Sequence, residues 1–151
     1  MKLTSCLVTL ASALSLGTVV QADIQDCGSQ LMNVDVWNHT PIVLGKGFCV
    51  TMGGQLHATI AQSEVRFHLV VNGLPRQVGP PQPICIGSCA VGEHTFEFCF
   101  QFPSWPGLAD KVVGLRLSSI DNSRRMRIFC KEESVKPQAG EMAKTGLRVQ
   151  G

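Results

Sequence analysis

The segment His94-Thr95-Phe96-Glu97-Phe98-Cys99-Phe100-Gln101-Phe102 decides the fold of this chain. Its four phenylalanines occupy alternate positions. Because successive side chains of a β-strand point to opposite faces, all four line one face of a sheet. A proline-rich loop ending in Cys85-Ile86-Gly87-Ser88-Cys89 precedes this strand. A stiff apolar face beside a loop bounded by two cysteines favours a pocket for an apolar ligand.

Alternating apolar and polar residues predict further strands on both sides of this segment. Val65, Phe67, Leu69 and Val71 alternate with polar residues, and residues 113–118 repeat the pattern. Residues 31–38 form a shorter strand in which Val34 and Val36 should share one side. The chain contains no sustained helical stripe. Six or seven short strands separated by turns predict an all-β fold, an antiparallel β-sandwich.

The N-terminus has the pattern of a secretory signal. Lys2 precedes an apolar stretch over residues 7–20, and Val20 and Ala22 suit a cleavage site, so the signal should span residues 1–22. The apolar stretch is too short to span a bilayer comfortably. Residues 23–135 should then form one domain, and the charged, Gly-containing residues 136–151 a disordered tail. We expect a secreted protein, or one in the lysosomal or endosomal lumen.

Six cysteines remain after removal of the signal: Cys27, Cys49, Cys85, Cys89, Cys99 and Cys130. An even number in a secreted chain predicts disulfides. A bridge between the first and the last would close a loop of about 100 residues and contribute about 4–5 kcal/mol. A bridge from Cys85 to Cys89 would fix the shape of a small loop. Alternation places Cys49 and Cys99 on outward faces, so they can pair only if their strands are neighbours or a bulge turns one of them.

The sequence lacks the residues that several classes of function require. The formal net charge of +2 gives no indication of nucleic-acid binding. The spacing of Cys85 and Cys89 would suit half of a zinc site, but no second pair accompanies it, and the four histidines lie far apart. We identify no nucleophile with an adjacent base and no carboxylate pair. The sequence therefore predicts no enzyme, no metal site and no cofactor.

Three surface features leave alternatives open. Asn38 begins an Asn-His-Thr glycosylation sequon that Pro41 follows directly. Arg124, Arg125 and Arg127 form a basic corner, either a solvated turn or a contact with an anionic membrane surface. Trp105, between two prolines, is either a core plug or the lip of a pocket.

The order of several motifs resembles the ML superfamily of lipid-recognition domains. These motifs are Asp26-Cys27-Gly28-Ser29, Lys46-Gly47 before a strand, the Asn72-Gly73-Leu74 turn, the proline-rich approach to Cys85 and Cys89, and Cys130 on the last strand. The resemblance covers residues 26–133. It differs in three respects. The small cysteine loop is shorter than is usual, and the segment after Cys130 is more charged than the usual closing strand. Cys49 and Cys99 lie on strands, whereas many members have an early cysteine pair between the first two strands.

The resemblance implies an immunoglobulin-like sandwich that holds a lipid in an apolar slot between its sheets, without catalysis. It implies Cys27–Cys130 and Cys85–Cys89 bridges. The positions matching the pocket wall are Phe67, Leu69, Phe96, Phe98 and Phe100, with Pro103 and Trp105 near the mouth. We expect a monomer whose partner is a sterol, phospholipid, glycolipid or fatty acid. The alternatives are an adaptor that presents lipid to a receptor, and a sandwich with a filled core.

Overall fold

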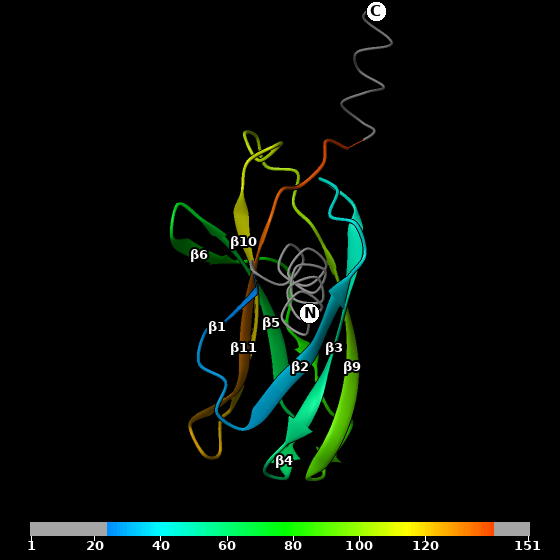
Figure 1. The fold of residues 1–151 in the computed structure, drawn as a ribbon, viewed down its shortest axis with the longest axis vertical. Coiled ribbons are helices and arrows are strands. Elements are labelled where there is room, and N and C mark those ends of the chain that lie inside the picture. Colours follow the sequence, from blue (N-terminus) through cyan, green and yellow to red (C-terminus); the bar gives the residue numbers. More distant parts are fainter. Residues whose placement is uncertain (1–23, 141–151) are drawn as a thin grey trace, which may run out of the picture.

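The computed structural model describes residues 24–140 and folds them into two antiparallel sheets that face each other (Figure 1). The larger sheet has the order β1 (Ile24–Asp26), β11 (Met126–Val135), β10 (Val113–Asp121), β5 (Glu64–Val71) and β6 (Leu74–Gln77), with β7 (Gln82–Pro83) also paired to β5. The smaller sheet has the order β2 (Met32–His39), β3 (Gly47–Leu56) and β9 (Gly92–Gln101), and β4 (Ile60–Ala61) pairs with β8 (Ser88–Cys89). The predicted all-β sandwich is confirmed. The predicted signal, residues 1–22, lies outside the described residues.

The described part of the chain contains no helix, and therefore none that could cross a membrane. Its alternating sequences form the strands that line the core. Val65, Phe67 and Leu69 of β5 and Leu115 and Leu117 of β10 are each no more than 1% exposed. Burying a large apolar side chain of this kind stabilises the fold by about 1.5–3 kcal/mol.

The predicted turn after β5 is a two-residue hairpin. Val71 pairs with Leu74, which leaves Asn72 and Gly73 as the two central residues. Both have positive φ, 53° and 79°, as a type I′ turn requires. Asn and Gly are the residues that adopt this conformation most readily, so the local sequence sets the reversal of the chain.

A β-bulge in β2 corrects the prediction that Val34 and Val36 share a side. The register with β3 shifts between these two residues, and Val36 is 48% exposed. The extra residue turns Trp37 and His39 to the inner side, opposite Met52 and Val50. Gly54 permits the close approach of the strands, because a Cβ there would lie 1.7 Å from the Asn33 carbonyl oxygen.

Three disulfides hold the domain, and they include the two expected bridges, Cys27–Cys130 and Cys85–Cys89. The third links Cys49 to Cys99, whose pairing the sequence left open. Both side chains point outward, and β3 and β9 are neighbours that place the two cysteines directly opposite each other. The Cys49 backbone bonds Thr40 on its other side, so this is a non-hydrogen-bonded pair, the closer of the two antiparallel arrangements.

The last described residues run beside the loop before β3. The Leu44 N–H donates to the Gln138 carbonyl at 3.0 Å, and the Gln138 N–H donates to the Ile42 carbonyl at 2.9 Å. Residues 136–140, the start of the predicted tail, are thus held by backbone hydrogen bonds. Residues 141–151 lie outside the described residues.

Candidate functional site

The space between the two sheets is lined by apolar side chains from four central strands. Phe67 and Leu69 of β5 face Phe98 and Phe100 of β9, and all four side chains are at most 7% exposed. The structure therefore brings these four predicted wall residues together in the core. Inward positions of β3 and β10 complete the lining.

An aromatic cluster joins the two sheets in one half of this space, and it consists of Phe48, Phe67, Phe100 and Phe102. The Phe67 ring centroid lies 5.3 Å from that of Phe48 and 5.4 Å from that of Phe100. These spacings are ordinary for packed aromatic pairs, which contribute about 0.5–1.5 kcal/mol each beyond their burial. The rings themselves occupy the space between the sheets at this level.

Two members of the aromatic cluster are absent from the predicted wall. Phe102 is fully buried although it follows the end of β9, and Phe48 is 2% exposed. The alternation of apolar residues in the sequence indicates an inward position for both. Phe102 continues the alternation of Phe96, Phe98 and Phe100, and Phe48 alternates with Val50 and Met52.

The remaining wall residue, Phe96, lies nearer the solvent. It is half-buried and stacks between His94 and Phe98, with ring centroids 5.7 Å and 6.0 Å away. The inner face of β9 is thus half-buried at His94 and Phe96 and buried at Phe98 and Phe100. Phe96 borders the apolar interior at the start of the strand.

The two predicted mouth residues, Pro103 and Trp105, are half-buried in the loop after β9. The Trp105 ring packs against the hydrophobic core, and the Arg76 guanidinium lies over it, 5.1 Å from the ring centroid. Arg76 belongs to β6, the edge strand of the other sheet. Trp105 thus packs on the core and contacts the edge strand of the other sheet.

A polar group, which we call the clasp, joins the sheets along the opposite edge, and it consists of Trp37, His39 and Glu133. The Trp37 indole donates to Glu133 Oε1 at 2.8 Å, and His39 Nε2 lies 2.6 Å from Glu133 Oε2. The His39 and Glu133 side chains are 19% and 17% exposed. Alternation in the sequence does not predict this group, because Trp37 and His39 reach it only through the bulge in β2.

The clasp shifts the pKa of both ionisable members toward their charged forms. The hydrogen bond to Glu133 raises the pKa of His39 above its usual 6.5, against the opposing effect of burial. Burial has the largest single effect on Glu133 and works to raise its pKa. The hydrogen bond and the charge of His39, together with the hydrogen bond from Trp37, outweigh burial and lower the pKa below 4.5. The pair is therefore mutually stabilised as an ion pair.

Asn38, the predicted glycosylation site, lies between the two clasp residues of β2 and points the other way. It is exposed and pairs with the outward position Thr51 of β3. A glycan at Asn38 would lie on an edge strand, where it would hinder pairing with another chain.

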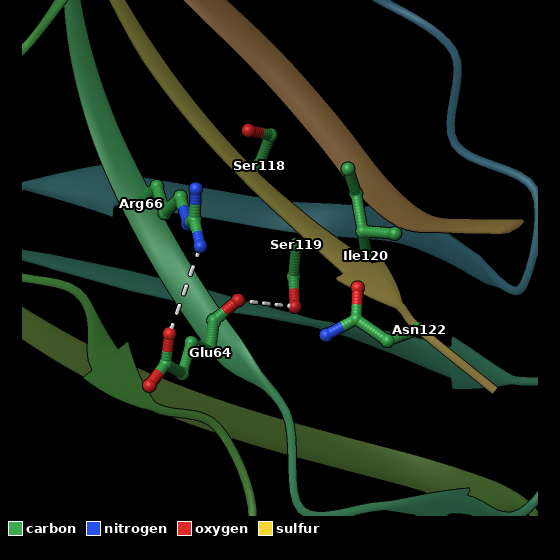
Figure 2. Close-up of a pocket in the computed structure, with 6 residues that line it drawn as sticks. All are labelled: Glu64, Arg66, Ser118, Ser119, Ile120 and Asn122. Atoms are coloured by element: carbon green, nitrogen blue, oxygen red, sulfur yellow. Dashed lines mark hydrogen bonds and ion pairs between the residues drawn. The ribbon is translucent and has the colours of Figure 1, made fainter. Parts of the chain in front are cut away.

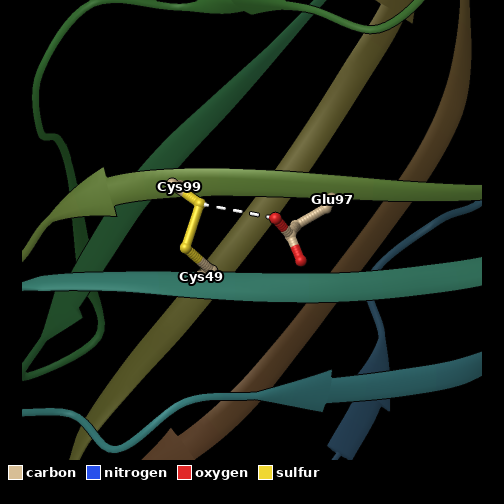
Figure 3. A group of neighbouring side chains, drawn as sticks. All are labelled: Cys49, Glu97 and Cys99. Carbon is tan, nitrogen blue, oxygen red and sulfur yellow. Dashed lines mark hydrogen bonds between the residues drawn. A yellow bond between two sulfur atoms is a disulfide. The ribbon is translucent and has the colours of Figure 1, made fainter.

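One group of potential metal ligands, Cys49, Glu97 and Cys99, lies on the outer face of the smaller sheet (Figure 3). The two sulfur atoms are bonded to each other, so neither is available as a thiolate ligand. The remaining carboxylate of Glu97 is exposed. This arrangement is a disulfide with a carboxylate beside it.

A small hollow of about 120 Å³ on the larger sheet is polar (Figure 2). The Ser119 hydroxyl donates to the Glu64 carbonyl oxygen at 2.7 Å, and the Arg66 side chain lies 3.9 Å from the Glu64 carboxylate. Three of its polar residues, Glu64, Arg66 and Ser119, thus already interact with one another. We find no apolar wall there that would suit a lipid, and the interior between the sheets is the better candidate site.

Comparisons with known proteins give a fold but no close relative. No protein-family model matches the sequence, and no curated protein matches it. A Niemann-Pick type C2 protein from the Japanese carpenter ant is similar in structure, with a TM-score of 0.62 and 12% identity over 76% of this chain and 98% of that chain. Chicken MD-1 complexed with lipid IVa gives a TM-score of 0.47 at 12% identity, over 76% of this chain and 96% of that chain.

The sporulation control protein Spo0M from Bacillus subtilis also gives 0.47, at 14% identity over 79% of this chain and 54% of that chain. Both likenesses at 0.47 are weaker than the first. The first shows that the chain shares its two-sheet fold with the Niemann-Pick type C2 protein, and it confirms the fold that the resemblance to the ML superfamily led us to expect.

Proposed function

We propose that the protein binds the apolar part of a lipid between its two sheets and releases it without covalent chemistry. The observation that carries this proposal is the arrangement of the inner faces: apolar walls from both sheets, fastened along one edge by the clasp and bordered at the other by Trp105. Each CH₂ group that leaves water for such an interior gains about 0.8 kcal/mol. Burial alone can therefore hold a ligand.

The aromatic cluster sets the condition for binding. Phe48, Phe67, Phe100 and Phe102 fill the space between the sheets, so a ligand must displace these rings or part the sheets. When a ligand displaces the rings, their contacts with the ligand replace the contacts that they lose to one another. We propose that the rings move aside toward Trp105, where the loop after β9 meets β6.

The disulfides support a secreted or luminal location. All six described cysteines are paired, as is usual in an oxidising compartment. We propose that the protein acts outside the cell or in the endosomal or lysosomal lumen, as a monomer with lipid as its partner, and that Asn38 is glycosylated there. No cofactor is required.

Mass spectrometry of organic extracts from natively purified protein tests the proposal and identifies the ligand class. A stoichiometric sterol, phospholipid, glycolipid or fatty acid is the expected result. Protein that carries no lipid and takes none up from solution would support the filled-core alternative.

The variant Phe98→Asp tests the position of the site. A carboxylate on the inner face must be desolvated beside the ligand, so affinity for a fluorescent fatty acid or sterol should fall by about 100-fold or more. Thr95→Asp is the matched control, because it adds the same charge to the exposed face of the same strand. A folded Phe98→Asp protein, checked by circular dichroism, that binds like the wild type would show that this face does not line the site.

A further inference from the structure

Two strongly exposed aliphatic side chains lie at the end of the sandwich where Trp105 lies. Leu74 is 69% exposed and Val112 is 64% exposed. Leu74 follows the β5–β6 turn, and Val112 directly precedes β10. Val70 of β5 pairs with Gly114 of β10, so the register brings the turn and the start of β10 to the same end of the sheet. We call Leu74, Trp105 and Val112 the rim.

Cationic side chains are interleaved with the rim. Arg76 lies over the Trp105 ring, Lys111 is the neighbour of Val112, and Lys136 follows Val135, which pairs with Val113. Asp110 directly precedes Lys111, and the Glu132 carboxylate near the start of β10 is paired with Arg116. Apolar side chains with basic residues between them are the pattern of surfaces that bind the membrane interface.

The opposite end of the sandwich, which holds the basic corner considered from the sequence, is built differently. Arg124 forms an ion pair with the buried Asp121, and the Arg127 guanidinium donates to the Cys27 carbonyl. Two exposed apolar residues at this end, Ile86 and Val91, belong to the Cys85–Cys89 loop and its exit, and a third, Ile120, is 49% exposed and pairs with Arg127 on the larger sheet. Arg124 and Arg127 thus already bond groups of the protein, and, among the described residues, a single exposed aliphatic residue, Ile120, accompanies the arginines.

We propose that the rim is the surface on which the protein docks to an anionic lipid bilayer, with Leu74 and Val112 inserted at the headgroup level. This inference rests on the proposed function, since a carrier must meet a membrane to exchange its lipid. Charge complementarity identifies the bilayer as the partner. The adjacent Trp105 places the docked surface beside the border of the apolar interior.

Flotation of the full secreted chain with vesicles tests the proposal, using phosphatidylcholine alone and phosphatidylcholine with about one third phosphatidylserine. Binding should require phosphatidylserine and weaken as salt shortens the Debye length from about 10 Å at 0.1 M. The variant Lys111→Gln/Lys136→Gln should lose about fivefold in binding for each lysine, and Leu74→Ser/Val112→Ser should lose several-fold in addition.

Matched variants at the other end provide the control. Arg125→Gln/Arg127→Gln removes two cations and Ile86→Ser/Val91→Ser removes two exposed aliphatic residues, and both proteins should float like the wild type. If instead these variants lose binding while the rim variants keep it, the proposal is overturned in favour of the basic corner. Self-association that Leu74→Asp abolishes would also overturn it, because the rim would then contact a second copy.

A separate measurement distinguishes failure of docking from failure of the proposed function. Binding of a soluble fluorescent fatty acid, in the absence of vesicles, should be unchanged in every rim variant. If the wild type takes up no ligand yet still floats with anionic vesicles, the proposed function fails and docking stands. If ligand binds but flotation does not depend on the rim, docking fails alone.

Discussion

The two seams at which the sheets meet are held by different kinds of interaction. Along the β2–β11 seam, Glu133 bonds Trp37 and His39, and the Cys27–Cys130 bridge ties the start of the domain to β11. Along the seam between β6, β7 and β9, the Gln82 side chain donates to the Cys99 carbonyl and Arg76 covers Trp105. The half-buried ion pair fastens the sheets at the first seam, and the disulfide beside it holds the segment between β1 and β2 against β11 within the larger sheet. Opening for a ligand is therefore expected at the second seam.

Among these interactions, the Cys27–Cys130 bridge should have the largest effect on stability. The Cys27→Ala/Cys130→Ala variant frees a loop with a sequence separation of 103 residues, which corresponds to about 4–5 kcal/mol of unfolding free energy. The Cys85→Ala/Cys89→Ala variant is the comparison, and its much shorter loop corresponds to about 2 kcal/mol. Denaturant unfolding monitored by circular dichroism measures both. Equal losses of unfolding free energy would show that the length of the closed loop does not set how much each bridge contributes.

The clasp should have the next largest effect. Glu133→Ala leaves the Trp37 indole and the His39 ring without their acceptor, so the unfolding free energy should fall by about 1–3 kcal/mol. Glu132→Ala is the matched control. Glu132 is the preceding residue, and its ion pair with Arg116 lies on the outer face, where such pairs contribute less than about 1 kcal/mol. If both variants lose the same stability, the clasp has no special role in joining the sheets.

The clasp also predicts how stability depends on pH. The contribution of His39 should be complete below 6.5 and lost as the pH rises through its raised folded pKa. The contribution of Glu133 should be complete above 4.5 and lost as the pH falls through its lowered folded pKa. The clasp thus stabilises the fold most between these values, which suits an acidic lumen.

Unfolding of the wild type and His39→Asn at about pH 5.5 and about pH 8 measures this effect. The wild type should lose stability between the two, and the variant should lose less. A variant with the same pH dependence as the wild type would assign the loss to other groups. An NMR titration of the His39 ring gives an independent reading of its pKa.

The smallest effect on stability is expected at the second seam. Arg76→Gln removes the cation over Trp105, which contributes about 0.5–1 kcal/mol at an exposed site. Because this contact bridges two edges, its loss should leave the affinity for a soluble lipid unchanged and accelerate uptake and release. Stopped-flow fluorescence measures both rates, with Arg66→Gln on the outer face of β5 as control. Rates equal to the control would show that the sheets do not part at Trp105.

The local sequence pattern predicted the features of the fold that depend on residues close together in the chain. The alternation in β5, β9 and β10 predicted their inward faces, since side chains alternate along any strand. The Asn72-Gly73 pair predicted its hairpin turn because few residues accept positive φ. Phe67, Leu69, Phe98 and Phe100 could therefore be placed on inner faces from the sequence, and the structure buries all four. Their role toward a ligand remains a prediction.

The sequence by itself determined which faces are apolar and how many cysteines must find partners. The tertiary structure decided which strands are neighbours, and this adjacency settled the pairing of Cys49 with Cys99, two outward residues that alternation alone could not join. It also decided the clasp, because a single extra residue in β2 reversed the alternation and turned Trp37 and His39 toward Glu133, 94 or more positions away in the chain. Alternation is set within a strand, whereas adjacency and bulges are set by packing between strands distant in sequence.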